Sequence, residues 1–237
     1  DTWILWSFTE LSLALGTITS GLPYDVFLYN NAGTLTLELL AWTNGTTRAT
    51  ALTTQNGVLV KTGATTRRYL GTFYTTATTT TEDSAAKRFL WNYYNQRPRP
   101  LRRIETTATW TYTTATIRQA RGSALNQVEA IIGWAEATVD LVVNAHWSNT
   151  SAVNVAIGIG LDSTTSMATQ QIGGSTRSEA AADHDTSAQA VFTPVVGYHY
   201  FAWLETSQAA GTTTWTIDHS ASGTNAKLSG LTGWING

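Results

Sequence analysis

The side chains best suited to metal binding or catalysis are dispersed along the sequence. The histidines are His146, His184, His199 and His219. No two of them form an i, i+4 pair or have the tight spacing that a zinc site uses. Cysteine is absent, which excludes a thiolate metal site, a disulfide framework and a cysteine nucleophile. The sequence therefore predicts no catalytic residue, no metal site and no cofactor.

Two short motifs invite a chemical interpretation, but their surroundings favour a simpler one. Asp183-His184-Asp185 is the most ligand-like cluster, yet it lies in a stretch rich in Ser, Ala and Thr, which favours a solvated polar loop. Gly158-Ile159-Gly160 superficially resembles part of a nucleotide-binding motif. Its glycines alternate inside a strand-like segment, so we expect them to permit close packing.

Carboxylates and tryptophans together could form a sugar-cleaving site. The 16 acidic residues nominate no pair by their spacing, although Asp140, Asp162 and Asp218 would be the first to test. Four tryptophans occur in strand-like segments, where aromatic side chains fill the core more often than they bind sugars. These are Trp134, Trp147, Trp203 and Trp215. We therefore expect a protein that is not an enzyme.

A cluster of basic residues is the strongest candidate for binding a partner. Its members are Arg97, Arg99, Arg102 and Arg103, with Trp91 and Tyr94 beside them. Pro98 and Pro100 fix the backbone φ there, so the guanidinium groups lose less conformational freedom on binding. We predict that this strip docks to an acidic protein surface. In the alternative, the arginines only cap a preceding helix and face water.

The charge balance bears on the kind of partner. Residues 61–121 contain eleven basic and three acidic residues, whereas the whole chain has a formal net charge of −2. Arginines mixed with aromatic residues also occur in nucleic-acid binders, but those proteins normally have a basic balance overall. We therefore expect a protein partner and no nucleic acid.

Composition and alternation indicate that sheets position these residues. Threonine occupies 44 of 237 positions and charged residues only 13%, a balance that favours strands. Alternating leucines predict half-buried strands at residues 10–15 and 34–39, and a turn at residues 30–33 predicts a hairpin between residues 24–29 and 34–39. Further strands are expected at residues 58–60, 69–74, 109–112, 128–133, 139–143, 153–161, 190–193, 198–204 and 215–217.

One segment interrupts the alternation. Between Ser84 and Gln96 the apolar positions fall four residues apart, as Ala85, Phe89 and Tyr93 do, which is the stripe of an amphipathic helix. Acidic residues and Ser84 suit the start of a helix, and the prolines that follow would end it. The sequence thus predicts one helix near residues 84–96.

The predicted fold is mainly all-β, an antiparallel, jelly-roll-like sandwich with that one helix. We expect a β-rich anchoring region at residues 1–104, which includes the helix, and a jelly-roll-like sandwich at residues 105–237. No apolar run approaches the roughly 18 residues of a membrane-spanning helix, and no signal peptide is evident. We therefore expect no membrane partner.

Part of the chain resembles a known family. The motifs TRRYLGTF at residues 66–73 and DSAAKRFLWNYYN at residues 83–95 are followed by a turn rich in Pro and Arg. Their order and spacing are similar to those of a family of tailed-phage and prophage structural proteins, and the likeness covers residues 3 to about 119. Beyond Gln119 the sequence departs from that family, which suits an exposed module that varies between phages.

The resemblance implies a virion protein without enzymatic activity, of the head-decoration, head-fibre or tail-associated kind. Its partners would be other capsid or tail proteins, and it would be located in the virion. The low charge fraction and the apolar faces predict a homotrimer with a shared core. The alternative is a receptor-binding or glycan-binding tip of a fibre or spike, with a host-surface glycan as its partner.

Overall fold

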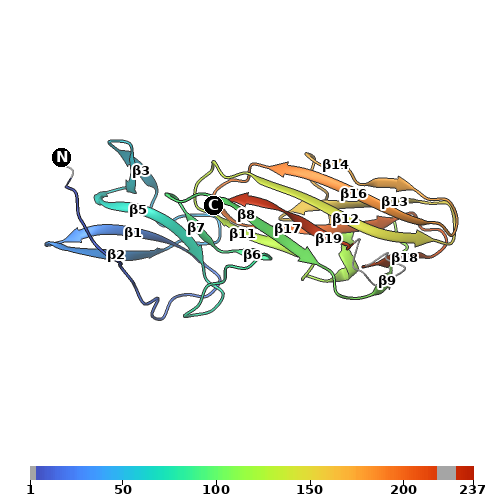
Figure 1. Ribbon diagram of the computed structural model, residues 1–237, viewed down its shortest axis with the longest axis horizontal. Helices are drawn as coiled ribbons and strands as arrows, with labels where there is room; N and C mark the ends of the chain where they lie inside the picture. The colour runs from blue at the N-terminus through green and yellow to red at the C-terminus, as the bar shows by residue number, and fades with distance from the viewer. Residues whose placement is uncertain (1–3, 218–227) are drawn as a thin grey trace.

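The structure is a computed structural model that describes residues 4–217 and 228–237 of the chain. These residues form three sheets of mostly antiparallel strands, and the only helical element among them is a 3-10 turn, η1 (Ala120–Gly122). The molecule is elongated, with an N-terminal sheet at one end and a two-sheet sandwich at the other (Figure 1). The predicted all-β sandwich class is confirmed. The described part contains no helix with the length and apolar character needed to cross a membrane.

The N-terminal sheet has the strand order β2-β1-β5-β4-β3, and β7 pairs with β5. Its β1–β2 hairpin forms as predicted. Ala32 and Gly33 adopt positive φ in the turn, and the Gly33 amide donates a hydrogen bond to Asn30 Oδ1 at 2.7 Å. The strands are β1 (Pro23–Asn31), β2 (Thr34–Ala41), β3 (Leu52–Gln55), β4 (Val58–Lys61), β5 (Ala64–Tyr74) and β7 (Leu90–Asn92).

The sandwich consists of two sheets that share one core. In the first sheet the order is β15-β13-β17-β11-β6, and β10 also pairs with β17. In the second the order is β14-β16-β12-β18-β9, and β19 bridges β12 and β8. The first sheet contains β6 (Lys87–Arg88), β10 (Arg118–Gln119), β11 (Gln127–Ile132), β13 (Asn154–Leu161), β15 (Ser175–Arg177) and β17 (Gly197–Ser207). The second contains β8 (Pro98–Ile104), β9 (Thr109–Thr111), β12 (Val139–Asn149), β14 (Ile172–Gly173), β16 (Asp183–Phe192), β18 (Thr213–Thr216) and β19 (Gly230–Asn236).

The two-residue period of the strands places the core between the sheets. In β12 the odd-numbered residues are buried, while most of the even-numbered ones stay half-buried. Trp147, Trp203 and Trp215 are at most 2% exposed and fill this core, as predicted. Trp134 is only partly buried and packs in the smaller cluster nearer the N-terminal sheet. The predominantly apolar interior supplies the main driving force for folding.

The glycines of β13 permit close packing, which confirms the prediction made for them. A Cβ atom on Gly160 would lie 2.2 Å from the Ser163 carbonyl oxygen, and one on Gly158 would lie 2.6 Å from Met167 Cγ. Any larger residue at these positions would therefore collide with the segment that crosses β13.

An aromatic and polar junction joins the N-terminal sheet to the end of the sandwich. Arg48 bonds to Asp25 Oδ2 at 2.8 Å and donates to the Gly133 carbonyl oxygen at 2.5 Å. Tyr74 stacks on Tyr198 with ring centroids 4.6 Å apart. Burial raises the pKa of Asp25, and the Arg48 charge opposes that rise. Arg48 thereby ties groups of the two parts together.

The helix predicted at residues 84–96 is wrong, because β6, β7 and turns occupy this segment. Phe89 and Trp91 are buried, whereas Leu90 between them is 42% exposed. A spacing of four is a multiple of the strand period, so apolar residues four apart share a face in either conformation. Trp91 distinguishes the two: it falls outside the helical stripe but on the same strand face as Phe89. The aromatic content of the segment also favours a strand.

The strand predicted at residues 10–15 does not form within the chain. Residues 4–17 belong to no ladder and make no hydrogen bond to another described residue. Leu13 is 42% exposed, and Leu11 and Leu15 are half-buried. A strand requires a partner for its amides and carbonyls, and this segment has none among the described residues.

Two strands that precede residue 104 belong to the sandwich sheets. β6 runs parallel to β11 in the first sheet, and β8 pairs antiparallel with β19, the last strand of the chain. The boundary predicted after residue 104 therefore falls beside strands that already contribute to the sandwich. Residues 98–104 are consequently held in place by their pairing with β19, the last strand.

Candidate partner-docking site

The site is built around β8, which lies at the edge of its sheet. Among the described strands, β8 pairs only with β19. The amide of Arg102 points away from β19 and donates to the Ala85 carbonyl oxygen at 2.7 Å. Pro98 and Pro100 have the same parity as Arg102, so their missing N–H groups remove no bond to β19. An edge strand therefore accommodates the two prolines that would end a helix.

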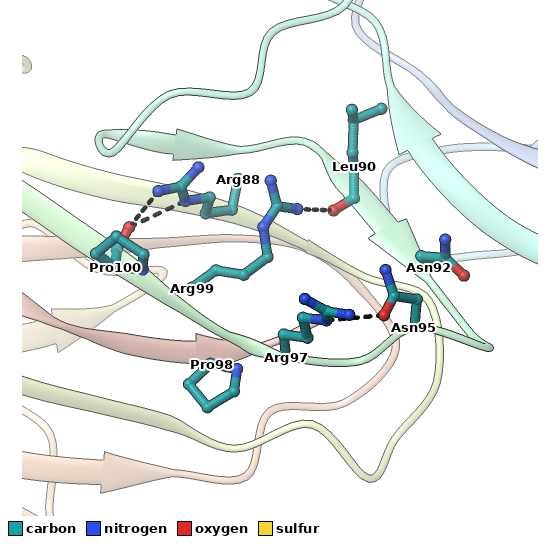
Figure 2. A pocket seen from close by; sticks show the side chains of 9 residues that line it. Arg88, Leu90, Asn92, Asn95, Arg97, Pro98, Arg99 and Pro100 are labelled. Carbon is teal, nitrogen blue, oxygen red and sulfur yellow. Dashed lines mark hydrogen bonds between the residues drawn. The ribbon is translucent and has the colours of Figure 1, made fainter.

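A pocket of about 470 Å³ opens between β8 and the β6–β7 segment (Figure 2). From one wall, Arg88 donates two hydrogen bonds to the Pro100 carbonyl oxygen, at 2.9 and 2.7 Å. From the other, Arg99 donates to the Leu90 carbonyl oxygen at 2.7 Å. In each wall of the pocket, a backbone carbonyl oxygen thus accepts hydrogen bonds from an arginine of the opposite wall. The lining residues are Arg88, Leu90, Asn92, Asn95, Arg97, Pro98, Arg99, Pro100 and Gly237.

Positive charge predominates around this pocket. Asp83 pairs with Arg88 at 3.4 Å and also with Arg99. Arg97 is exposed, and its one side-chain partner in the described part is Asn95 Oδ1, at 2.9 Å. Burial lowers the pKa of Arg88 and Arg99, although a guanidinium group stays charged at neutral pH. Three guanidinium groups paired with one acidic side chain suit the binding of an additional anionic group, such as a carboxylate.

The four predicted arginines do not form one continuous strip. Successive strand residues point to opposite faces, so Arg99 and Arg103 lie on one side of β8 and Arg102 on the other. Arg102 is exposed, and its side chain makes no hydrogen bond within residues 4–217 and 228–237. Arg103 is half-buried, with a buried Nε that no described group accepts from. Of the four, only Arg97 and Arg99 line the pocket.

The two aromatic candidates lie in different environments. Trp91 is 3% exposed and packs on Tyr69, with ring centroids 6.5 Å apart, so it cannot touch a partner at the surface. Tyr94 is 46% exposed and lies under Arg68, whose guanidinium carbon is 4.3 Å from the ring centroid. Of the two aromatic candidates, Tyr94 therefore remains accessible to a partner, with Arg68 beside it. Trp91 lies in the interior.

Sequence reasoning missed Arg88 and Asp83 as parts of this site. Both lie in the segment predicted to be helical, where Asp83 suits a capping role and Arg88 would face solvent. The signal that could have found them is the alternation of Phe89, Trp91 and Tyr93, which indicates a strand. A strand at this place can run beside β8 and bring Arg88 to it.

Seven of the eleven basic residues in residues 61–121 form ion pairs within the chain, with Arg88 and Arg99 paired to Asp83 as described above. The other ion pairs join Lys61 and Arg67 to Glu38, Lys87 to Glu82, Arg118 to Glu205, and Arg121 to Glu105. The exposed basic residues left in this range are Arg68, Arg97 and Arg102. Exposed positive charge without a carboxylate partner among the described residues therefore lies beside β8, on Arg97 and Arg102, and on β5, on Arg68.

The histidines of the described part have structural partners. His184 stacks on Trp147 with centroids 4.8 Å apart, within β16, so the polar loop predicted at residues 183–185 is instead the start of a strand. His199 lies between Asp162 Oδ2 and the Val195 carbonyl oxygen, at 2.7 and 2.8 Å. Within the described residues, no group of three His, Cys, Asp or Glu side chains could hold a metal ion. Asp218 and His219 lie outside the described residues.

The buried glutamates also have structural roles. Glu205 is 0% exposed and accepts a hydrogen bond from Arg118 Nε at 2.8 Å, while burial raises its pKa. Glu105 is 2% exposed and accepts from Arg121 Nε at 2.9 Å and Asn126 Nδ2 at 2.6 Å. Both fasten the chain around η1, because the Arg121 amide also donates to Glu205, at 2.9 Å.

Comparison with known proteins identifies no family. No protein-family model matches the chain, and no curated protein matches its sequence. The functional conclusion therefore depends on the residues of the pocket and on the fold that positions them.

Proposed function

We propose that the protein is a structural component of a tailed-phage virion, without enzymatic activity, that fastens to a neighbouring capsid or tail protein. The resemblance of residues 3–119 supports the virion role and a homotrimeric state. The observation that carries the docking role is the convergence of Arg88, Arg97 and Arg99 on one pocket, where Asp83 is the one acidic side chain of the described part that pairs with them. The partner surface is acidic, since a carboxylate complements the surplus charge.

The pocket is suited to recognition because part of it is already ordered. Arg88 and Arg99 are fixed by backbone carbonyl oxygens, so binding costs little further side-chain entropy. Arg97 is exposed and least committed to the chain's own groups, so it supplies the most direct contact with the partner. Arg99 is unsuitable as a test position, because its reversal would place two carboxylates together at Asp83.

Reversal of Arg97 to Glu tests the docking role. We expect R97E to fold with an unchanged melting temperature and to bind particles lacking the wild-type protein at least about tenfold more weakly, the loss of one charged contact. Wild-type attachment should weaken as salt rises. Attachment is measured by quantitative mass spectrometry of purified particles.

Arg102 provides a matched control for this reversal. It is an exposed arginine five positions after Arg97, it does not line the pocket, and its side chain lies on the face of β8 opposite that of Arg99. R102E should therefore attach as the wild type does. Normal attachment of R97E, or an equal loss of attachment in both variants, would show that the pocket is not the docking site.

Absence of catalysis is part of the proposal. The buried carboxylates Asp25, Glu105 and Glu205 each pair with an arginine, so none is poised to act as an acid or base on a substrate. Purified protein is expected to leave bacterial surface polysaccharide intact. Depolymerisation that disappears on substitution of Asp140 or Asp162 would replace this proposal with an enzyme.

A glycan-binding tip is the second candidate, and one exposed residue favours it. Trp234 of β19 is 55% exposed and lies between Pro100 of β8 and Asp140 of β12 in register. Gln189 donates to Asp140 at 3.0 Å. An exposed indole beside a carboxylate can stack on a sugar ring while the carboxylate accepts from its hydroxyl groups. Binding of host polysaccharide that Trp234→Ala abolishes would support this role.

A further inference from the structure

The N-terminal segment has the pattern of a strand but no strand partner. In residues 10–16, Leu11, Leu13 and Leu15 alternate with Glu, Ser and Ala. Residues 4–17 nevertheless make no hydrogen bond to another described residue. Leu13 is 42% exposed, and Leu5, nearer the N-terminus, is 98% exposed. An extended segment with unpaired amides and exposed leucines is suited to joining another sheet.

The outer strand of the N-terminal sheet offers a matching edge. β2 is eight residues long and pairs with β1 on one side, and no described strand pairs with its other side. Its leucines Leu35, Leu37 and Leu39 alternate with Thr and Glu and remain half-buried. A strand from residues 10–16 laid along this edge would extend the leucine face by cross-strand leucine pairs.

The edge of β2 also lacks the features that commonly prevent strand addition. It contains neither proline nor lysine, which many edge strands use for protection. Its single charged residue, Glu38, is bound by Lys61 at 2.5 Å and by Arg67 at 2.9 Å. The edge therefore presents unpaired backbone groups without an uncompensated charge.

We infer that residues 10–16 of one copy add as a strand to the free edge of β2 in a second copy. The occupant is another copy because no described strand of the same chain, this segment included, pairs with the outer edge of β2, while the leucine pattern of the segment matches that strand. Each copy has one donor segment and one acceptor edge, so passing the segment from copy to copy pairs every segment in a ring wherever the rotation between copies closes. This pairing adds a contact between copies to the proposed assembly role, and its biological function rests on that proposal.

Cross-linking between differently tagged copies tests this pairing. The chain has no cysteine, so Leu13→Cys in one copy and Leu37→Cys in the other provide unique attachment points. We expect a short bismaleimide to join the two variants in a mixture, at a yield that rises with concentration. A matched mixture uses Leu13→Cys with Ile172→Cys, since Ile172 is 79% exposed on β14 of the sandwich, and it should give little product.

Proline variants add an independent readout. Leu13→Pro places a residue with a fixed φ and no N–H in the middle of the added segment, so it should abolish the cross-link from a cysteine at position 11 and leave the circular dichroism spectrum unchanged. Thr9→Pro, outside the paired segment, should retain the cross-link. Equal yield with the Ile172→Cys control, or product only within a chain carrying both cysteines, would overturn the inference. R97E should not alter the cross-link, so failure of docking and failure of strand addition are distinguishable.

Discussion

Glu105 shows how one buried carboxylate organises a local conformation. Four donors converge on it: the amides of Thr106 and Thr107, Arg121 Nε and Asn126 Nδ2. These bonds hold the pKa of Glu105 at about 2, although burial opposes the decrease. Arg121, which has a φ of 59°, is thereby kept in the left-handed region that few non-glycine residues adopt.

Substitution of Glu105 by Gln should destabilise the protein. The amide cannot accept the same charge-assisted bonds, and it leaves the Arg121 charge without its partner. We expect the free energy of unfolding at pH 7 to fall by about 2 kcal/mol, the usual cost of an unsatisfied buried group. Urea denaturation of wild type and E105Q measures this difference. An unchanged midpoint would show that Glu105 does not fasten η1.

The same pair of proteins gives a pH dependence with a defined sign. Because the folded pKa of Glu105 lies below its unfolded value, its stabilisation is fully present above about pH 4.5 and is lost as the pH falls toward about 2. The difference in unfolding free energy between wild type and E105Q should therefore be constant from pH 7 to 5 and shrink below that. A difference that grows on acidification would contradict the assigned shift.

At the scale of elements, the sequence predicted strands well where a neighbour along the chain supplies the pairing. The β1–β2 hairpin follows from alternation and a turn with Asn30 and Gly33. The strands β6, β8 and β19 were not predicted: β6 has two residues, β8 contains two prolines and β19 two glycines, and their pairing joins distant parts of the chain. Residues 10–15 show the reverse case, in which a clear pattern has no strand partner within residues 4–217 and 228–237.

The candidate site was predictable only in part for the same reason. Composition and spacing pointed to Arg97 and Arg99, which line the pocket. Spacing could not reveal that strand alternation turns Arg102 away, or that Arg88 reaches β8 from β6. These relations depend on long-range register, which a local pattern does not contain.

Two substitutions in β7 test the strand that replaces the predicted helix. Trp91→Ala should cost about 3 kcal/mol or more, because the side chain is 3% exposed in the junction. Leu90→Ala should cost about 0.5 kcal/mol, since Leu90 is 42% exposed. A helical stripe would bury Leu90 and expose Trp91. Thermal and urea unfolding that rank Leu90→Ala as the more damaging change would support the helix instead.

The whole molecule consists of the N-terminal sheet and the sandwich, and each of these two parts has an edge strand that pairs with only one described strand. One edge, β8, carries the cationic pocket, and the other, β2, is free for strand addition. The junction through Arg48 holds the two parts together, so docking and self-association can act on one body. A virion protein needs both kinds of contact, one with its own copies and one with the shell or tail.

Cryo-electron microscopy of purified particles that encode this chain, combined with mass spectrometry of their proteins, tests the virion role most directly. We predict that the chain is a stoichiometric component and that its sandwich occupies a fixed position, with the pocket beside β8 against an acidic surface of a capsid or tail protein. Particles of full composition and infectivity that lack the chain would contradict the account.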